Sequence, residues 1–296
     1  MNTFTRPGDG RRVAGATVVC HDSVMQMTAP LRRAVTRFRT GRGWRRPRHL
    51  ALASITLLVA QCGPTECAPA PAPPAAGYFG WAGVGAALPS DAACAAAVRR
   101  GGAEIRPGNA GYNATTWSAS SATYPRATGN LTGTTDEIIQ WAACKWGFDE
   151  DTLRAQVVKE SYWTQTALGD WSTDAGVCAP GHPLGADGRP GQCPESVGLM
   201  QVRTQYFRDS IDGSLRSSAY NLDVALNAWR NCYEGQDTWL NTVERGRTYA
   251  AGDAWGCIGK WFSGRWYTAD ANTYIASVQQ LLGQRPWEAP GFVNAG

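Results

Sequence analysis

Residues 134–165 decide the fold, and they read TTDEIIQWAACKWGFDEDTLRAQVVKESYWTQ. Thr134 and Glu137 have the spacing of a capping box, which predicts a helix that begins at the next residue and carries its apolar side chains at helical period. Gly147 ends that helix, and Asp149 has the chemistry of an N-cap for a second helix, which we expect to reach the end of the segment. Two capped helices joined by a short turn predict a mainly helical domain.

The rest of the chain extends this helical pattern in both directions. No segment alternates over strand length and no internal repeat occurs, so the expected fold class is mainly α, with one domain over about 88–285. Within that domain we expect 107–133 to form an extended arm, because it is rich in Gly, Asn, Ser and Thr, and 286–296 to form a tail. Further helices are expected at 88–100, capped by Ser90 or Asp91, and at 197–208, 222–232, 238–243 and 272–282.

The net charge of +4 is unevenly distributed along the chain. Residues 1–49 contain 11 Arg against two Asp, a net charge of +9, so the remaining residues carry −5. A basic surface for nucleic acid is therefore not expected in the folded part.

The basic stretch leads directly into LALASITLLVA at 50–60, which is too short to span a bilayer but has the length of a signal-peptide apolar core. We therefore expect 1–60 to be an export signal, with translation beginning at Met1 or at a later Met, and the mature chain to have no stable membrane insertion. Cys62 follows Gln61, where lipidation needs a small residue, so a lipid anchor is not expected. The Pro, Ala and Gly of 61–87 predict a linker.

Six of the nine cysteines lie in the predicted domain, and in an exported chain they predict three disulfides. The pair that brackets a Gly/Pro-rich loop, Cys178 and Cys193, is the best single pairing. A zinc site that combined them with His182 would lack a fourth ligand, so no metal is expected. The pairing of the remaining cysteines stays open: Cys94, Cys144, Cys232 and Cys257.

Glu160 is the first candidate for chemistry. It lies three residues after Val157 and seven after Leu153, so the three side chains share one helix face that should otherwise be buried. Burial penalises an ionised carboxyl group and raises its pKa, so this glutamic acid could keep its proton near neutral pH. Cleavage of a glycosidic bond requires such an acid, because the leaving sugar oxygen must be protonated. A solvent-facing or Arg-paired glutamate is the ordinary alternative.

Two short motifs give Glu160 a context. Glu160-Ser161 is followed by Ser196-Val-Gly-Leu-Met-Gln201, and this ordered pair resembles the catalytic core of the soluble lytic transglycosylase and goose-type lysozyme family. The resemblance covers about 135–282 and implies a lysozyme-like fold, with residues 178–193 as a disulfide-bearing insertion. It implies that Glu160 is the acid/base, that no cofactor is used, and that a monomer binds peptidoglycan glycan strands. Substrate contacts are implied for Ser161, Ser196, Gly198, Met200 and Gln201, although Ser196 could also be a helix N-cap.

The resemblance is fainter toward the C-terminus. Asn221 matches the residue at which a family helix begins, whereas Trp261-Phe-Ser263-Gly stands where the family has Tyr-Asn-x-Gly, and Tyr274 stands where it has a later Tyr. By the resemblance, Trp261, Ser263 and Tyr274 are substrate-binding candidates, and the departures affect the expected subsite geometry rather than the acid.

Aromatic residues gather near these motifs, and flat aromatic faces can stack on sugar rings. Core packing is the commoner role, so we assign substrate contact to only two or three of seven: Trp255, Trp261, Trp266, Tyr267, Tyr162, Trp163 and Trp171.

The resemblance implies a lytic transglycosylase, which needs one glutamate and forms a 1,6-anhydro sugar. A hydrolase would need a second carboxylate, for which Asp170, Asp174 and Glu195 are the candidates. Spacing alone does not choose between them. Two hypotheses from other functional classes remain: a non-catalytic glycan-binding module and a disulfide-rich structural protein.

Overall fold

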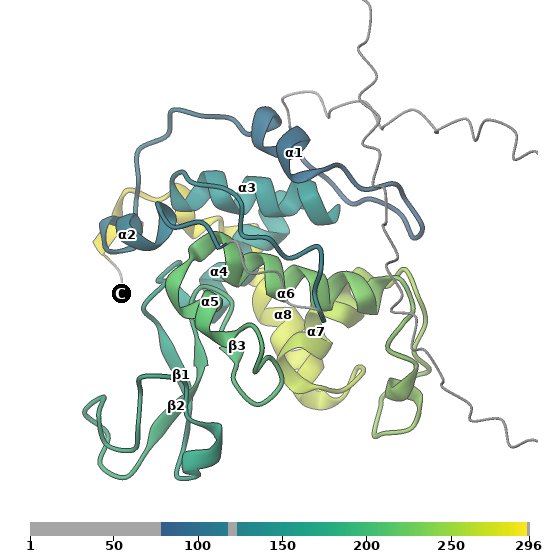
Figure 1. Cartoon of the computed structure of the whole chain (residues 1–296). Coiled ribbons are helices and arrows are strands. Elements are labelled where there is room, and N and C mark those ends of the chain that lie inside the picture. Colours follow the sequence, from purple (N-terminus) through teal and green to yellow (C-terminus); the bar gives the residue numbers. More distant parts are fainter. Residues whose placement is uncertain (1–77, 118–122, 295–296) are drawn as a thin grey trace, which may run out of the picture. The chain divides into compact units, whose positions relative to one another are not determined.

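The computed structural model describes residues 78–117 and 123–294. The predicted export signal over 1–60, Cys62 and the linker up to residue 77 lie outside the described residues. The described part is mainly helical with one small antiparallel sheet, and the β1–β2 hairpin projects on one side of the helices (Figure 1). Its helices are α1 (Asp91–Ala97), α2 (Ala110–Asn113), α3 (Thr135–Trp146), α4 (Glu150–Ser161), α5 (Ile211–Arg216), α6 (Ser218–Tyr233), α7 (Ala254–Ser263) and α8 (Ala269–Gln284). Short 3₁₀ turns are η1 (Pro107–Asn109), η2 (Ala175–Val177), η3 (Thr238–Asn241), η4 (Pro286–Glu288) and η5 (Pro290–Asn294).

Helices α3 and α4 begin where the caps predicted. The Thr134 side chain accepts from the Glu137 backbone N–H, and the Glu137 carboxylate accepts from the Thr134 N–H, so the capping box is complete. Gly147 ends α3 at φ +63°, and Asp149 caps α4. Almost the whole circumference of α3 is buried, because α4 and α6 pack against it together with α1. Helix α4 ends at Ser161, four residues earlier than expected.

The strands were not predicted. β1 (Leu168–Ser172), β2 (Cys193–Val197) and β3 (Val202–Arg203) form one antiparallel sheet in that order. Leu168 pairs with Val197 at the start of β1, and Ser172 pairs with Cys193 at its end. The predicted helix over 197–208 is therefore wrong, and so is an N-cap at Ser196, which lies within β2. A left-handed backbone at Gly198 (φ +80°) and a strand partner distant in sequence override the helical spacing of the apolar residues.

Helix α7 was also missed, because its glycines and aromatic residues lower helix propensity. Two of those glycines permit close packing instead. A Cβ on Gly256 would lie 2.3 Å from the Trp266 ring, and one on Gly259 would lie 2.8 Å from Ile275 of α8. The α7–α8 pair consequently packs tightly beside α4.

Both ends of the described chain pack on the domain, beyond the boundaries of 88 and 285 that the sequence suggested. Phe79 is buried, and its carbonyl oxygen accepts from the Glu150 N–H (2.9 Å). Phe292 is buried against Tyr162 (ring centroids 4.7 Å apart). The arm over 107–133 contains η1 and α2, and it is fixed to the domain by the buried side chain of Asn109.

Three disulfides join the six cysteines of the described domain, as the sequence predicted. Cys178 pairs with Cys193, which confirms the one pairing expected from the loop between them. That bond leaves no thiolate there for a zinc ion. The other pairs are Cys94–Cys144 and Cys232–Cys257. Among the described residues, no helix is long and apolar enough to cross a membrane.

Reduction is expected to lower the melting temperature, because loss of a native disulfide typically costs about 2–5 kcal/mol. Calorimetry with and without reductant measures this. Serine replacement of Cys94 and Cys144, which are 50 residues apart, should destabilise more than replacement of Cys178 and Cys193, which are 15 apart. An unchanged melting curve in a sample whose mass shows free thiols would contradict the expectation.

Candidate functional site

Glu160 lies in the last turn of α4, where α4, α7, α8 and the sheet meet. Leu153 and Val157 on the same helix face are fully buried, as predicted, whereas Glu160 keeps part of its surface accessible. The Tyr274 hydroxyl of α8 donates to Glu160 Oε1. The Trp261 indole N–H donates to the Met200 carbonyl oxygen (3.2 Å) and also bonds Glu160.

The surroundings raise the pKa of Glu160 to about 8. Burial is the largest cause, because it removes water from the charged form. The negative charge of Asp170 raises the pKa further, while the Tyr274 hydrogen bond, the positive charge of Lys159 and the Trp261 hydrogen bond lower it. Near neutral pH the group therefore carries a proton that it can donate.

Left-handed backbone conformations gather around this carboxyl group. Among the described residues, six non-glycine residues have positive φ, and four of them belong to the segments beside Glu160. Tyr162 (φ 54°) and Trp163 (φ 61°) turn the chain at the end of α4, and Asp170 (φ 49°) and Gln201 (φ 51°) lie on the strands and their connecting turn. Such conformations cost energy and are retained where the surrounding structure fixes them, often at functional sites.

The two motifs that the sequence singled out lie against each other. The Ser161 hydroxyl donates to the Leu199 carbonyl oxygen (2.9 Å), which joins the end of α4 to the β2–β3 turn. Asn221 of α6 holds the same turn, because it accepts from the Met200 N–H (2.8 Å) and donates to the Val197 carbonyl oxygen (3.0 Å). A Cβ on Gly198 would lie 2.2 Å from the Asn221 amide, so packing on α6 requires glycine there.

Two of the predicted substrate residues serve this turn. Met200 is buried. Gln201 donates from its amide nitrogen to the carbonyl oxygens of Ala167 (3.2 Å) and Gly198 (3.0 Å), so it closes the turn onto the start of β1. Ser263 has its partners at the end of α7, where its hydroxyl lies within donor distance of the carbonyl oxygens of Gly259 (3.0 Å) and Arg265 (3.1 Å).

The three candidate second carboxylates differ in their surroundings. Asp170 is exposed, accepts from the Ser196 hydroxyl and acts electrostatically on Glu160. Glu195 is buried in an ion pair with Arg203 (2.6 Å). Its neighbour Ser196 points to the opposite face of β2, because side chains alternate along a strand. Asp174 caps η2 through the Gly176 N–H (2.8 Å).

Most of the seven aromatic candidates have other partners. Trp163 and Trp266 are buried in the core. Trp171 lies under the Arg189 guanidinium (4.2 Å to the ring centroid), and Tyr267 lies under that of Arg247 (3.5 Å). Tyr162 packs against Phe292 with the two rings tilted by 30°, and Trp255 packs against the core from a half-buried position. Trp261 is the one of the seven whose hydrogen bond acts on the pKa of Glu160.

Phe262 is a site residue that sequence reasoning missed. Its ring is 57% exposed and lies parallel to the Tyr274 ring, with centroids 4.8 Å apart and 3° between the planes. Because Tyr274 bonds Glu160, Phe262 presents a flat apolar face next to the acid. Its place in the sequence gave no signal, because only the position of α8 shows where the ring lies.

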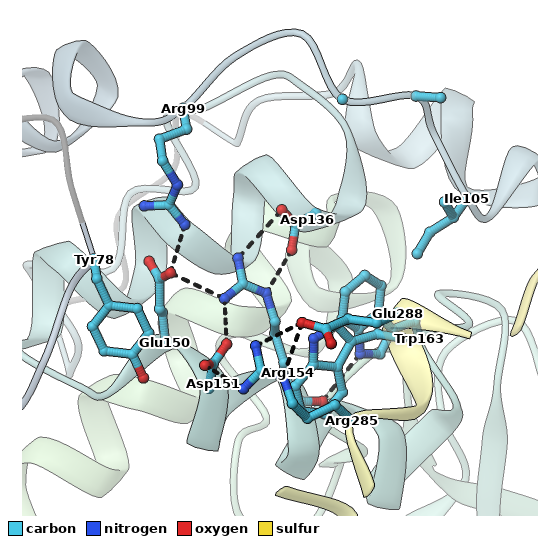
Figure 2. Close-up of a pocket in the computed structure, with 13 residues that line it drawn as sticks. Tyr78, Arg99, Ile105, Asp136, Glu150, Asp151, Arg154, Trp163, Arg285 and Glu288 are labelled. Atoms are coloured by element: carbon cyan, nitrogen blue, oxygen red, sulfur yellow. Dashed lines mark hydrogen bonds and ion pairs between the residues drawn. The ribbon is translucent and has the colours of Figure 1, made fainter. Parts of the chain in front are cut away.

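A cavity of about 370 Å³ lies elsewhere, beside the first turn of α4. Figure 2 shows Arg154 within it, between the carboxylates of Asp136 (2.7 Å), Asp151 (2.8 Å) and Glu150 (3.1 Å). Arg285 bonds Asp151 from the C-terminal side (2.6 Å). These pairs neutralise one another and join α3, α4 and the C-terminal segment, so we assign the cavity a structural role. Glu160 does not line it.

Comparison with known proteins gave no match: no family model, no curated protein and no solved structure is significantly similar to this chain.

Proposed function

We propose that this protein is an exported lytic transglycosylase that cleaves the MurNAc–GlcNAc β-1,4 bond of peptidoglycan. The observation that carries the proposal is the accessible Glu160 carboxyl group, whose pKa of about 8 keeps it protonated near neutral pH. The contact between Ser161 and the turn after Ser196 supports it, because the two family-like motifs meet at that acid.

In the proposed reaction Glu160 donates its proton to the glycosidic oxygen, and the bond from that oxygen to the anomeric carbon breaks. The Glu160 carboxylate then accepts the proton of the 6-hydroxyl of the same muramic acid residue, whose oxygen bonds the anomeric carbon. The product is a 1,6-anhydro sugar, and the acid is restored. No water and no second carboxylate take part.

A lysozyme-type hydrolase is the second candidate, and one contact favours it. The Ser196 hydroxyl bonds Asp170, and the charge of Asp170 acts on Glu160, so this carboxylate could activate a water molecule. Glu195 suits that role less well, because Arg203 neutralises it.

Mass spectrometry of the products released from peptidoglycan by the purified protein tests the proposal. We expect 1,6-anhydro-muropeptides. Reducing-end muropeptides would replace the transglycosylase with a hydrolase and direct attention to Asp170. Intact glycan that the protein nevertheless binds would indicate a non-catalytic module, and neither cleavage nor binding would favour a structural protein.

The activity is expected to fall as pH rises through about 8, because the acid must be protonated and that is where Glu160 ionises. An ordinary glutamic acid, with a pKa of 4.5, would already be ionised at pH 6. The profile of kcat/KM against pH measures the pKa in the free enzyme. A basic limb below pH 6 would show that the surroundings do not hold the proton.

Phe262→Ala is expected to raise KM by about 3- to 10-fold with little change in kcat, since ring stacking contributes about 0.5–1.5 kcal/mol. Initial rates on a defined glycan oligomer measure both constants. Trp239→Ala, at another exposed aromatic residue on η3, is the matched control and should change neither. Equal effects of both substitutions would contradict a sugar platform at Phe262.

A further inference from the structure

Gln156 is a buried polar residue that the proposed reaction does not use. It lies on α4 one turn before Glu160, on the same face, and is only 2% exposed. Its side chain acts on the Tyr274 hydroxyl of α8 as a hydrogen-bond partner that lowers the Tyr274 pKa, while its Oε1 has no hydrogen-bond partner. A buried carbonyl oxygen without a partner destabilises the fold, so a residue kept in this state needs a reason.

The direction of the hydrogen bond follows from its chemistry. The Tyr274 hydroxyl has one proton, which it donates to Glu160 Oε1. A Gln156 carbonyl facing Tyr274 would compete for that proton, whereas the amide N–H supplies a second one. The amide nitrogen of Gln156 therefore faces the hydroxyl, and its buried Oε1 is left without a donor.

We propose that Gln156 is a positioning residue that directs the Tyr274 proton at Glu160 Oε1 and thereby leaves the acid proton of Glu160 on Oε2. The inference rests on the proposed function, because it assigns which oxygen of the acid is free to face the sugar. With the Tyr274 oxygen already accepting from Gln156, a proton on Glu160 Oε1 would meet the Tyr274 proton. The proton on Oε2 has no such conflict.

Without the Gln156 N–H, the Tyr274 oxygen could accept a proton from Glu160. The protonated form of Glu160 would gain a hydrogen bond, and that raises the pKa of an acid. Tyr274 would also become a weaker donor to the carboxylate, because chained hydrogen bonds polarise one another, and this acts in the same direction. The other groups that act on Glu160 would be unchanged: Lys159 on α4, Asp170 on β1 and Trp261 on α7.

Gln156→Met, which keeps the shape and removes both polar groups, tests the inference. We expect the pKa of Glu160 to rise by about half a unit, since one hydrogen bond is worth less than one pKa unit in most cases. We expect kcat below pH 7 to fall by about 3- to 10-fold with KM unchanged, because part of the acid proton is misdirected. The melting temperature should hold or increase, since the unpartnered carbonyl oxygen is removed.

The pKa is measured by ¹³C NMR on protein labelled at glutamate side-chain carboxyls, with the Glu160 signal assigned by its loss in Glu160→Gln. A double-mutant cycle with Tyr274→Phe tests whether Gln156 acts on Glu160 through the Tyr274 hydroxyl. In the Tyr274→Phe background, Gln156→Met should change neither the Glu160 pKa nor kcat. Gln140→Met, at an equally buried glutamine of α3 that bonds the Arg99 N–H, is the matched control and should leave the Glu160 titration unchanged.

An unchanged Glu160 titration in Gln156→Met would overturn the inference, and so would a shift that persists without the Tyr274 hydroxyl. The titration needs no turnover, so the two proposals fail separately. If the shift in the Glu160 pKa depends on Tyr274 but the protein cleaves no glycan, the positioning role of Gln156 stands and the proposed function falls. If the protein cleaves glycan but Gln156→Met does not shift the Glu160 pKa, the proposed function stands and the role of Gln156 falls.

Discussion

Replacing Glu160 by glutamine is expected to lower the rate of glycan cleavage by about 10²–10⁴-fold or more, because the proton donor is lost. The amide has nearly the same shape and can still accept from the Tyr274 hydroxyl, so the fold and glycan binding should survive. Rates on purified peptidoglycan, circular dichroism and a pull-down with insoluble glycan measure the three properties. Glu244→Gln, on an exposed loop, is the control. Retained activity would exclude Glu160 as the acid.

The same substitution should change the pH dependence of stability. The pKa of Glu160 is raised from 4.5 to about 8, so between these values the folded state holds a proton that the unfolded chain has released. The free energy of unfolding of the native protein therefore falls as pH rises through this window. Glu160→Gln lacks this contribution. The melting temperature of the variant, relative to that of the native protein, should therefore increase from pH 5 to pH 8.

Replacing Asp223 by alanine is expected to destabilise the protein by about 3–5 kcal/mol, because it leaves a charged lysine in the core without its main partner. Asp223 of α6 and Lys145 of α3 are both fully buried, and their charged atoms are 2.6 Å apart. Asp223 also accepts from the backbone N–H groups of Thr128 (2.7 Å) and Gly129 (3.0 Å) and from the Trp146 indole (2.6 Å). It thus joins the segment before α3 to the two central helices.

Urea denaturation with intact disulfides measures this loss. Asp212→Ala breaks the Asp212–Arg216 pair on the surface of α5, where both side chains are more than half exposed, and should cost at most about 1 kcal/mol. Removing Lys145 together with Asp223 should not restore full stability, since the backbone and indole donors would stay without an acceptor. Equal losses for Asp223→Ala and Asp212→Ala would contradict the structural role of the buried pair.

Local chemistry predicted where α3 and α4 begin, but it missed α7 and the whole sheet. Caps at Thr134 and Asp149 act within a few residues, so the sequence reveals them directly. The β2 strand is stabilised by β1, which lies more than twenty residues earlier, and residues 197–200, where β2 ends and the next turn begins, also fit a helix. Residues 78–87 were expected to be linker because of their composition, although Phe79 and Trp81 are aromatic residues that need a packing partner.

The candidate site was predicted in its centre but not in its surroundings. Short motifs in the sequence indicated Glu160 and the segment after Ser196 as parts of the candidate site. Gln156 and Phe262 gave no signal, because their roles depend on how α8 packs against α4 and α7. The sequence also did not reveal that the Ser263 hydroxyl bonds backbone groups at the end of α7.

The Cys178–Cys193 bond allows the loop that it closes to change in sequence without a change in the fold of the domain. The bond fixes the two ends of the loop where β2 begins, and most of the residues between them are exposed. Ala179, next to Cys178, is buried, but lengthening the exposed part of the loop costs little closure entropy and leaves that contact in place. Mutations can therefore change the length and the side chains of this loop while the fold stays the same. This makes the loop the part of the protein best suited to evolve a new binding preference.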